Sequence, residues 1–230
     1  TRLGDINGDG FDDLLIAGNA ADNYNAKFNG AVYVIFGEAS TAGAANDLWD
    51  ANISLDNLAA RGKGLRIVGA IDGDYLGRAS WTGVGDMNGD GYADFIVQSS
   101  GEQEGNAANN GTSGTGSSYL ILGQPTAAWG NIDALEVQDF GIQLLGTGST
   151  LPTNGDLNVQ RTWTALGDVD GDGFDDVALV SNTGAQIFYG SQALSGYRDA
   201  SWTALGNGLN VVQTVTGTAG TLLQAQRGNS

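Results

Sequence analysis

The nine residues Asp86-Met87-Asn88-Gly89-Asp90-Gly91-Tyr92-Ala93-Asp94 decide the fold of this 230-residue chain. The pattern recurs as Asp5 to Asp13 (DINGDGFDD) and as Asp168 to Asp176 (DVDGDGFDD). Side-chain oxygens at positions 1, 3, 5 and 9, together with the backbone carbonyl of position 7, can converge on one hard cation that prefers oxygen ligands. The glycine at position 6 permits the sharp turn that this convergence needs. The pattern therefore predicts a calcium loop at each of the three places.

Each loop offers five candidate ligands, and we predict three Ca²⁺ ions, one per loop. Asp, Asn and Gly also form ordinary turns, so one such loop alone would be weak evidence. Three loops in register, with every side-chain position filled by an oxygen ligand, favour calcium. The predicted ligands are Asp5, Asn7, Asp9, Phe11 and Asp13 in the first loop, Asp86, Asn88, Asp90, Tyr92 and Asp94 in the second, and Asp168, Asp170, Asp172, Phe174 and Asp176 in the third. The three aromatic residues contribute only their carbonyl oxygens.

The sequence around the loops predicts strands, whereas an EF-hand loop lies between helices. An EF-hand takes a bidentate Glu at position 12, but position 12 here is Ile16, Val97 or Leu179. Short apolar runs rich in β-branched residues follow the loops, and strand-like runs precede them. The runs after the loops are residues 14–17, 95–97 and 177–180, and those before the second and third loops are 81–85 and 163–167. Each metal loop is therefore predicted to be the turn of a β-hairpin.

The loops recur at a nearly fixed period, since Asp86 follows Asp5 by 81 residues and Asp168 follows Asp86 by 82. Each period carries further strand-like runs bounded by glycine. A third strand is predicted at 30–37, 118–123 and 184–190, and a fourth at 64–69 and 141–146. Four antiparallel strands per unit, at a period far too long for a solenoid coil, are typical of propeller blades. We predict an all-β fold made of four-stranded β-propeller blades, as part of a larger propeller.

The segment from Leu76 to Val97 (LGRASWTGVGDMNGDGYADFIV), with a downstream strand like Gly30 to Gly37 (GAVYVIFG), resembles the FG-GAP repeat of integrin α-subunit propellers. It is still more similar to the bacterial version of that repeat. The resemblance covers most of residues 1–190 and implies calcium-binding propeller blades. The chain departs from the repeat where the FG dipeptide reads Leu76-Gly77, where Asn158-Val159 stands before the third unit, and where the Ala-Pro dipeptide after the second strand is absent. The resemblance therefore implies a fold and not an integrin's ligand.

We predict one partial propeller domain over residues 1–230. Blade 1 covers residues 1–70, blade 2 covers 75–147, blade 3 covers 158–200, and a degenerate terminal element covers 201–230. In that element Asn207 stands at loop position 1 and the other carboxylates are missing, so the fourth loop should not bind calcium.

Three units and a partial fourth are at or below the four to eight blades that close a propeller. Because Thr1 to Asp5 aligns with Thr82 to Asp86, we expect the chain to be part of a longer polypeptide. Either the terminal strand pairs with the first unit and closes the ring, or an open edge remains that promotes association.

Composition restricts the setting and the partners. The formal net charge of −17 argues against nucleic acid or an anionic membrane surface as a partner, and no apolar run predicts membrane insertion. The chain has no cysteine, so we expect metal to take the role of a disulfide staple. Calcium sites of this kind stay filled where the ion is near millimolar, which favours an extracellular or cell-surface location. The lack of cysteine favours a bacterial source.

The sequence gives little sign of a catalytic site, although Tyr, Arg and Lys could serve in one. The chain has no histidine, which removes the commonest general base, and no Tyr/Arg or carboxylate pair stands out beyond the loops. We therefore predict no enzyme activity. The expected function is that of a non-catalytic, calcium-binding module of a large secreted or surface bacterial protein, acting in adhesion or in recognition of a protein or glycan. The alternative is the propeller domain of a carbohydrate-active enzyme, a polysaccharide lyase or hydrolase.

Two further groups of residues are candidates for ligand sites, namely the tryptophans and the second connections of the units. The tryptophans Trp81, Trp163 and Trp202 recur at one blade position, which predicts packing between blades more than stacking on sugars. Packing is also preferred for Trp49 and Trp129 in the spacers. The second connections, residues 18–29, 101–117 and 181–183, lie on the face opposite the calcium loops, and the first two are long, polar and different in sequence. They are either ligand loops on a rigid scaffold or tolerated insertions.

Overall fold

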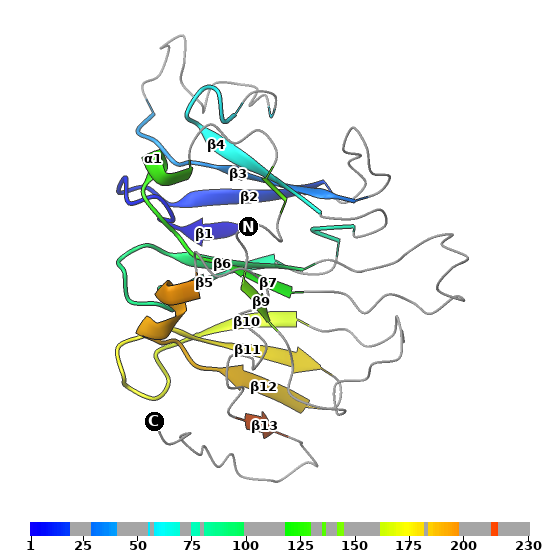
Figure 1. The fold of residues 1–230 in the computed structure, drawn as a ribbon, viewed down its shortest axis with the longest axis vertical. Coiled ribbons are helices and arrows are strands. Elements are labelled where there is room, and N and C mark those ends of the chain that lie inside the picture. The colour runs from blue at the N-terminus through cyan, green and yellow to red at the C-terminus, as the bar shows by residue number, and fades with distance from the viewer. Residues whose placement is uncertain are drawn as a thin grey trace, which may run out of the picture.

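The computed structural model describes residues 1–18, 29–40, 55, 58–69, 75–78, 81–98, 118–129, 135–136, 142–144, 162–181, 184–197 and 213–215. These residues form three β-sheets with very little helix (Figure 1). Within each sheet the first four strands pair antiparallel with their neighbours. The predicted all-β fold of four-stranded blades is confirmed.

The first sheet has the strand order β1-β2-β3-β4-β8. Its strands are β1 (Arg2–Gly4), β2 (Asp13–Gly18), β3 (Ala31–Ile35), β4 (Gly64–Val68) and β8 (Leu135–Glu136). The first four follow one another in sequence, as expected of an up-and-down blade. β8 differs because it comes from the following unit and pairs with β4 in parallel.

The second and third sheets repeat this arrangement. The second contains β5 (Trp81–Gly85), β6 (Asp94–Gln98), β7 (Ser118–Ile121) and β9 (Ile142–Leu144). The third contains β10 (Thr162–Gly167), β11 (Asp176–Ser181), β12 (Gly184–Phe188) and β13 (Gln213–Val215). β13 lies in the segment 201–230, for which the sequence predicts a separate terminal element. In the structure it pairs with β12, so the third sheet takes its fourth strand from beyond residue 200.

Two short helical segments follow the third strands of the second and third sheets. They are α1 (Thr126–Trp129) and the 3-10 helix η2 (Gln192–Tyr197). Trp129 of α1 and Leu194 of η2 are buried. At the start of η2 the Ala193 N–H donates to Ser191 Oγ at 3.1 Å, which caps the segment.

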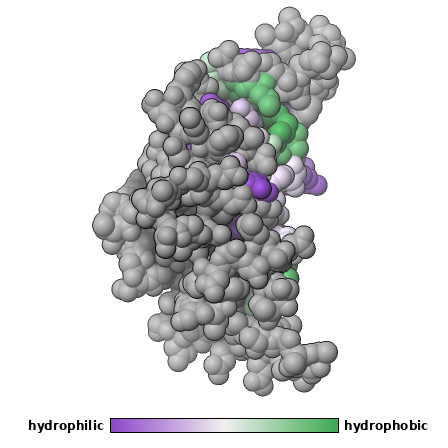
Figure 2. Space-filling view, turned by 90° about the vertical axis from the view of Figure 1, so that its right-hand side faces the viewer, coloured by the Kyte–Doolittle hydropathy of each residue, from purple (hydrophilic) through white to green (hydrophobic). Residues whose placement is uncertain are grey.

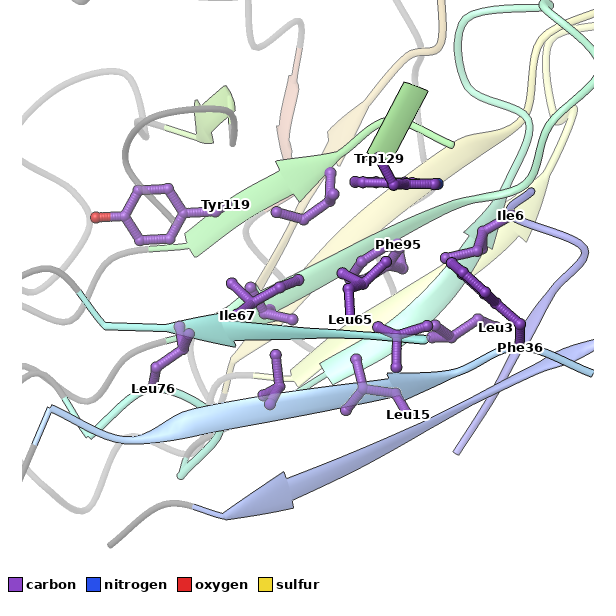
Figure 3. Packing of buried hydrophobic residues seen from close by; sticks show 14 residues of the cluster. Leu3, Ile6, Leu15, Phe36, Leu65, Ile67, Leu76, Phe95, Tyr119 and Trp129 are labelled. Atoms are coloured by element: carbon purple, nitrogen blue, oxygen red, sulfur yellow. The ribbon is translucent and has the colours of Figure 1, made fainter. Parts of the chain in front are cut away.

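The hydrophobic core lies between successive sheets. One cluster joins residues of the first two sheets, among them Leu15, Leu65, Phe95 and Ile121 (Figure 3). A second cluster joins the second and third sheets. β5 contacts both β1 and β10, so the first strands of neighbouring sheets meet, and the three sheets follow one another down the long axis of Figure 1. The sheets therefore stack as successive blades.

The tryptophan side chains that the structure describes serve packing. Trp163 on β10 is buried, its ring centroid lies 5.0 Å from that of Phe188, and its Nε1–H donates to Ser118 Oγ on β7 at 2.9 Å. This contact between the third and second sheets confirms the predicted packing between blades. Trp81 packs against the first cluster and Trp129 belongs to it. Trp49 and Trp202 lie outside the residues described.

The first strands of the first two sheets approach so closely that β5 has no room for a side chain at Gly83. A Cβ added there would lie 2.6 Å from the carbonyl oxygen of Leu3 on β1. We expect Gly83→Ala to lower the free energy of unfolding by about 1–3 kcal/mol, as overpacking does, measured by urea denaturation. The matched control is Ala165→Gly at the equivalent, exposed position of β10, where the loss should be about 1 kcal/mol or less. An unchanged stability in Gly83→Ala would contradict the close approach.

Candidate metal centres

The three nine-residue loops occupy equivalent places in the three sheets. Each joins the first strand to the second, and all three lie on the same side of the molecule, the left in Figure 1. The pairing before each loop contains the same register shift, between residues 2 and 4, 83 and 85, and 165 and 167. The prediction that each loop is the turn of a β-hairpin is therefore confirmed.

The carboxylate at position 1 organises the backbone of each loop. In the first loop Asp5 Oδ1 accepts hydrogen bonds from the N–H groups of Gly8 at 2.7 Å and Asp9 at 3.1 Å, and Oδ2 accepts from Gly10 at 2.8 Å. The other two loops repeat all three bonds at nearly the same distances. The position-6 glycines have φ of 90°, 89° and 94°, the left-handed region that glycine favours. The predicted sharp turn is present in each loop.

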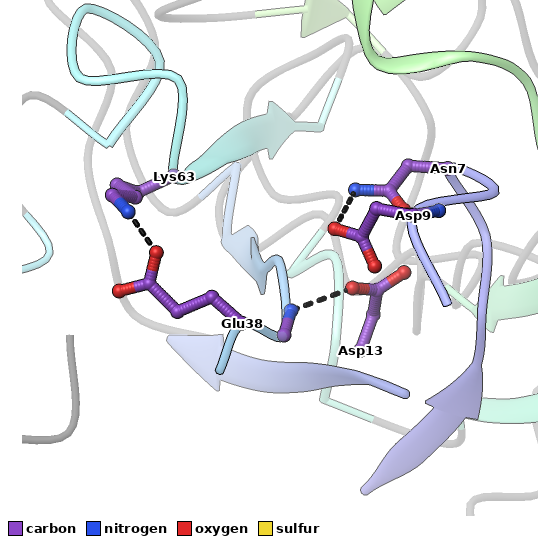
Figure 4. Close-up of polar contacts among 6 residues, drawn as sticks. Asn7, Asp9, Asp13, Glu38 and Lys63 are labelled. Atoms are coloured by element: carbon purple, nitrogen blue, oxygen red, sulfur yellow. Dashed lines mark hydrogen bonds and ion pairs between the residues drawn. The ribbon is translucent and has the colours of Figure 1, made fainter. Parts of the chain in front are cut away.

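The carboxylate at position 9 connects the loop to two strands. Asp13 begins β2 and is buried, and its Oδ2 accepts from the Ile6 N–H at 2.8 Å. Its Oδ1 accepts from the Gly37 N–H, also at 2.8 Å (Figure 4). Asp94 and Asp176 accept the equivalent pairs of bonds. Each side chain thereby joins the start of the loop, the second strand and the residues just after the third strand.

These buried carboxylates are costly to ionise. Burial raises the pKa of Asp13 to about 7 and that of Asp94 to about 8, and it also raises the pKa of Asp176. The backbone hydrogen bonds lower these pKa values in part, while neighbouring carboxylates of the same loop raise them further. The nearby Lys63 pairs with Glu38 (Figure 4). A cation bound in the loop would supply the positive charge that favours the ionised form.

Position 3 distinguishes the third loop from the other two. In the first loop the Asn7 amide donates from Nδ2 to Asp9 Oδ2 at 2.9 Å, and Asn88 donates to Asp90 in the same way in the second. The third loop has Asp170 instead, and an ionised carboxylate has no hydrogen to donate. In the first two loops the Asn amide offsets part of the repulsion between carboxylates. The third loop has no such amide, so a cation would relieve more carboxylate repulsion there than in the other two.

The third loop also has the spacing of a metal site. Carboxylate oxygens of Asp168, Asp170 and Asp176 all lie within 4.8 Å of one another, the one such acidic group found in the described part of the chain. Every side-chain ligand offered by the three loops is an oxygen, which suits Ca²⁺ and not a metal that prefers nitrogen or sulfur. The residues present therefore fit calcium.

Successive loops contact one another through their backbones, which the sequence did not predict. The Ala93 N–H, at position 8 of the second loop, donates to the Asp5 carbonyl of the first at 2.9 Å. The Asp175 N–H of the third loop donates to the Asp86 carbonyl of the second at 3.1 Å, and the Asp86 N–H donates back to Asp175 Oδ2 at 2.8 Å. The candidate metal centres thus form a linked row.

The aromatic residue at position 7 also reaches the preceding loop. A Cβ added at Gly8 would lie 2.5 Å from the Tyr92 ring, and one added at Gly89 would lie 2.6 Å from the Phe174 ring. The glycine at position 4 therefore makes room for the aromatic side chain of the next loop. The recurrence of an aromatic at position 7 and a glycine at position 4 was the sequence signal for this contact.

Several predicted features fall outside the residues described. They are the fourth loop at Asn207, the segment 101–117, and residues 19–28 and 182–183 of the other second connections. No helix in the described part of the chain is both long and apolar enough to cross a membrane.

Comparison of the sequence with known protein families identifies the repeat. No curated protein matches the chain. The family model of the FG-GAP repeat matches residues 2–35 and 79–121. Both matches hold a first strand, a nine-residue loop, and the second and third strands of a sheet. Residues 2–35 and 79–121 of this chain are therefore FG-GAP repeats, each forming most of one blade.

Proposed function

We propose that the chain is a non-catalytic β-propeller module that binds three Ca²⁺ ions, one per loop, and takes part in adhesion or in recognition of a protein or glycan outside a bacterial cell. The observation that carries calcium binding is the acidic group of the third loop, with three carboxylates within 4.8 Å of one another. Like charges at this spacing repel, and a divalent cation would offset them. The repetition of the same loop geometry in the other two sheets extends the proposal to three sites.

The side chains at positions 1, 3, 5 and 9 would hold the ion, together with the carbonyl of position 7. When bound, Ca²⁺ supplies positive charge and coordinates oxygens from both ends of the loop. The chain's own contribution is to fix those oxygens in advance, since Asp5 and Asp13 already accept backbone hydrogen bonds. Binding free energy at such a site becomes part of the folding free energy.

A structural role for the ion is consistent with the position of the loops. The row of loops lies where successive blades meet, so calcium would stabilise the contacts between blades as well as each hairpin. Among the described residues, the carboxyl groups with raised pKa values are those at position 9 of the loops. These side chains accept backbone hydrogen bonds, which is a structural role. These features support a scaffold, and FG-GAP repeats are typical of extracellular domains. Connecting loops on such a scaffold commonly carry the binding residues.

Calcium stoichiometry tests the metal sites directly. Isothermal titration of the metal-free chain should give three Ca²⁺ per chain, and Asp168→Asn/Asp170→Asn should give two, because the third loop loses two of its four predicted carboxylate ligands. Asp12→Asn is the matched control, since Asp12 is an exposed aspartate at position 8 that is not a predicted ligand, and it should keep three. No heat of binding at millimolar calcium would overturn the proposal.

Recognition and catalysis are separated by two parallel assays on the calcium-loaded chain. A glycan array detects binding, and a depolymerisation assay on the glycans that bind detects reducing ends or unsaturated products. Binding without product supports the recognition module. Product formation would contradict it and support the alternative, the propeller domain of a carbohydrate-active enzyme.

A further inference from the structure

The peptide group that joins positions 1 and 2 of a loop is hydrogen-bonded on both sides. In the second loop its carbonyl, that of Asp86, accepts from the Asp175 N–H at 3.1 Å, and its N–H donates to Asp94 Oδ2 at 2.8 Å. The first loop has the equivalent bonds, from Ala93 at 2.9 Å and to Asp13 at 2.8 Å. One peptide group therefore connects position 8 of the following loop with the position-9 carboxylate of its own loop.

A second route joins the same loops through the residues after the third strand. Asp94 Oδ1 accepts from the Gly123 N–H at 2.8 Å. The next N–H along the chain, that of Gln124, donates to the Ile6 carbonyl at position 2 of the first loop, also at 2.8 Å. The third unit repeats both bonds toward the second loop. Positions 1 and 2 of a loop are therefore held by two segments of the next unit, and both segments adjoin the position-9 carboxylate of that unit.

Position 8 lies between two predicted ligands of its own loop. The carbonyl of position 7 and the carboxylate of position 9 would both be fixed when the loop is filled. In the third loop these are Phe174 and Asp176, and Asp175 lies between them. Asp175 bonds both the carbonyl and the N–H of Asp86, the position-1 ligand of the second loop. Filling the third loop would thus order part of the second, so the conformational entropy lost there is not lost again when the second loop is filled.

The two contacts between loops differ at position 8. Asp175 Oδ2 accepts from the Asp86 N–H at 2.8 Å. This carboxylate lies against Gly85, where a Cβ would leave it no room. The second loop has Ala93 at position 8, which has no oxygen to offer to the N–H of Asp5. The contact between the third and second loops therefore has a side-chain hydrogen bond that the contact between the second and first loops cannot make.

Charge acts in the opposite direction to these contacts. The ligand set of the second loop has three carboxylates and that of the third has four, so one divalent cation leaves either loop net negative. A filled neighbouring loop therefore still attracts a cation, but less than an empty one does. Salt screens this effect of charge at a distance, whereas the loops touch one another through hydrogen bonds. Higher salt should therefore favour the effect of the contacts.

The side of the molecule away from the loops, which faces the viewer in Figure 2, also holds contacts between units. The Trp163 Nε1–H donates to Ser118 Oγ at 2.9 Å, and the Leu76 N–H donates to the Asn29 carbonyl at 2.9 Å. None of these residues belongs to a loop. Such contacts join the units without touching a predicted metal ligand, so they distinguish general packing from coupling through the loops.

We propose that the metal centres bind Ca²⁺ cooperatively, so that filling one loop raises the affinity of the loop before it, and that Asp175 makes this coupling strongest between the third and second loops. The proposal rests on the calcium sites proposed above. Coupling is reciprocal, so the second loop raises the affinity of the third by the same factor. We expect about a tenfold effect between the third and second loops, within the range common for coupled sites, and a smaller one between the second and first.

Variants with one or two intact loops measure the coupling. A loop is disabled by changing its aspartates at positions 1 and 5 to Asn, which keeps an oxygen for the backbone N–H groups. The pairs are Asp5→Asn/Asp9→Asn, Asp86→Asn/Asp90→Asn and Asp168→Asn/Asp172→Asn. With the first loop disabled, isothermal titration gives the overall association constant for the second and third sites, and the single-site variants give the separate constants. The overall constant divided by the product of the separate ones is the coupling factor, which equals one for independent sites.

Asp175→Ala should lower this factor to the one measured between the first and second loops, where Ala93 stands. Asp175→Asn should retain most of it, because the amide oxygen can still accept from the Asp86 N–H. Ser118→Ala is the matched control, since it removes a hydrogen bond between the same two units on the side away from the loops. It should leave the factor unchanged. Higher salt should raise the factor in the unmodified contact.

Hydrogen exchange followed by NMR gives a readout that does not depend on affinity. In the variant whose third loop alone is intact, calcium should slow the exchange of the amide hydrogens of residues 86 and 87 in the disabled second loop. Neither this measurement nor the comparison of the two coupling factors needs a change at Asp175, so both decide the proposal if Asp175→Ala does not fold.

A coupling factor of one or below between the second and third loops would overturn the proposal. So would equal factors for the two contacts, a factor that Asp175→Ala leaves unchanged, or unaltered exchange at residues 86 and 87. Three ions bound with a factor of one would leave the calcium sites in place and remove only the coupling, whereas a chain that binds no calcium would remove both.

Discussion

Excess EGTA should lower the melting temperature of the calcium-loaded chain by about 5–10 °C for each site that was filled. A site held at 100 times its dissociation constant adds about 2.7 kcal/mol to the free energy of unfolding, and about 1 kcal/mol shifts the midpoint of a chain of this size by roughly 2–4 °C. The effect is large because the buried position-9 carboxylates, whose pKa values are raised to about 7 and about 8 in the first two loops, lose the cation that favours their charge. Differential scanning calorimetry measures the shift.

The control for chelation is readdition of metal. Calcium in excess over EGTA should restore the midpoint, and the same concentration of Mg²⁺ should restore little of it, because the smaller ion demands octahedral geometry and gives up water reluctantly. A midpoint that does not move in EGTA would show that the loops hold their shape without a cation.

Asp94→Ala should destabilise the chain by about 2–5 kcal/mol, since it leaves two buried N–H groups without an acceptor at about 1–3 kcal/mol each. The groups are those of Met87 and Gly123, each 2.8 Å from an Asp94 oxygen. Asp94 is fully buried, so water cannot replace the lost acceptor without rearrangement. The change in the free energy of unfolding is measured by urea denaturation in EGTA, where the loss of a metal ligand does not contribute.

The matched control is Asp12→Ala, which removes an exposed aspartate whose carboxylate forms a surface ion pair with Arg2. Its cost should be about 1 kcal/mol or less. Equal costs for Asp94→Ala and Asp12→Ala in EGTA would mean that the position-9 carboxylate acts through the metal alone.

The strands and the loops were predictable because their causes are local. A run such as residues 14–17 is apolar and bounded by a turn, and the loop oxygens are fixed by residue type and spacing within nine positions. Because the nine-residue pattern occurs three times at a nearly fixed period, it predicts the loop more reliably than a single occurrence would. This is why the hairpin position of every loop was correct.

The contacts between units were not predictable, because their partners are far apart in sequence. Nothing local to Tyr92 indicates that its ring lies against Gly8, and nothing in Gln213–Val215 indicates that it pairs with β12. Strand pairing of this kind is decided by which sheet edge is open, and the sequence around residues 213–215 carries no information about that edge.

The parallel pairing of β8 with β4 has a consequence for the order of synthesis. β4 would otherwise be the outer strand of the first sheet, with unpaired backbone groups that can template pairing with another chain. Its cover, Leu135–Glu136, is supplied by the spacer of the next unit. A ribosome therefore completes the first four strands well before it delivers the segment that protects them, and the nascent blade is exposed to misassembly until most of the second unit has emerged.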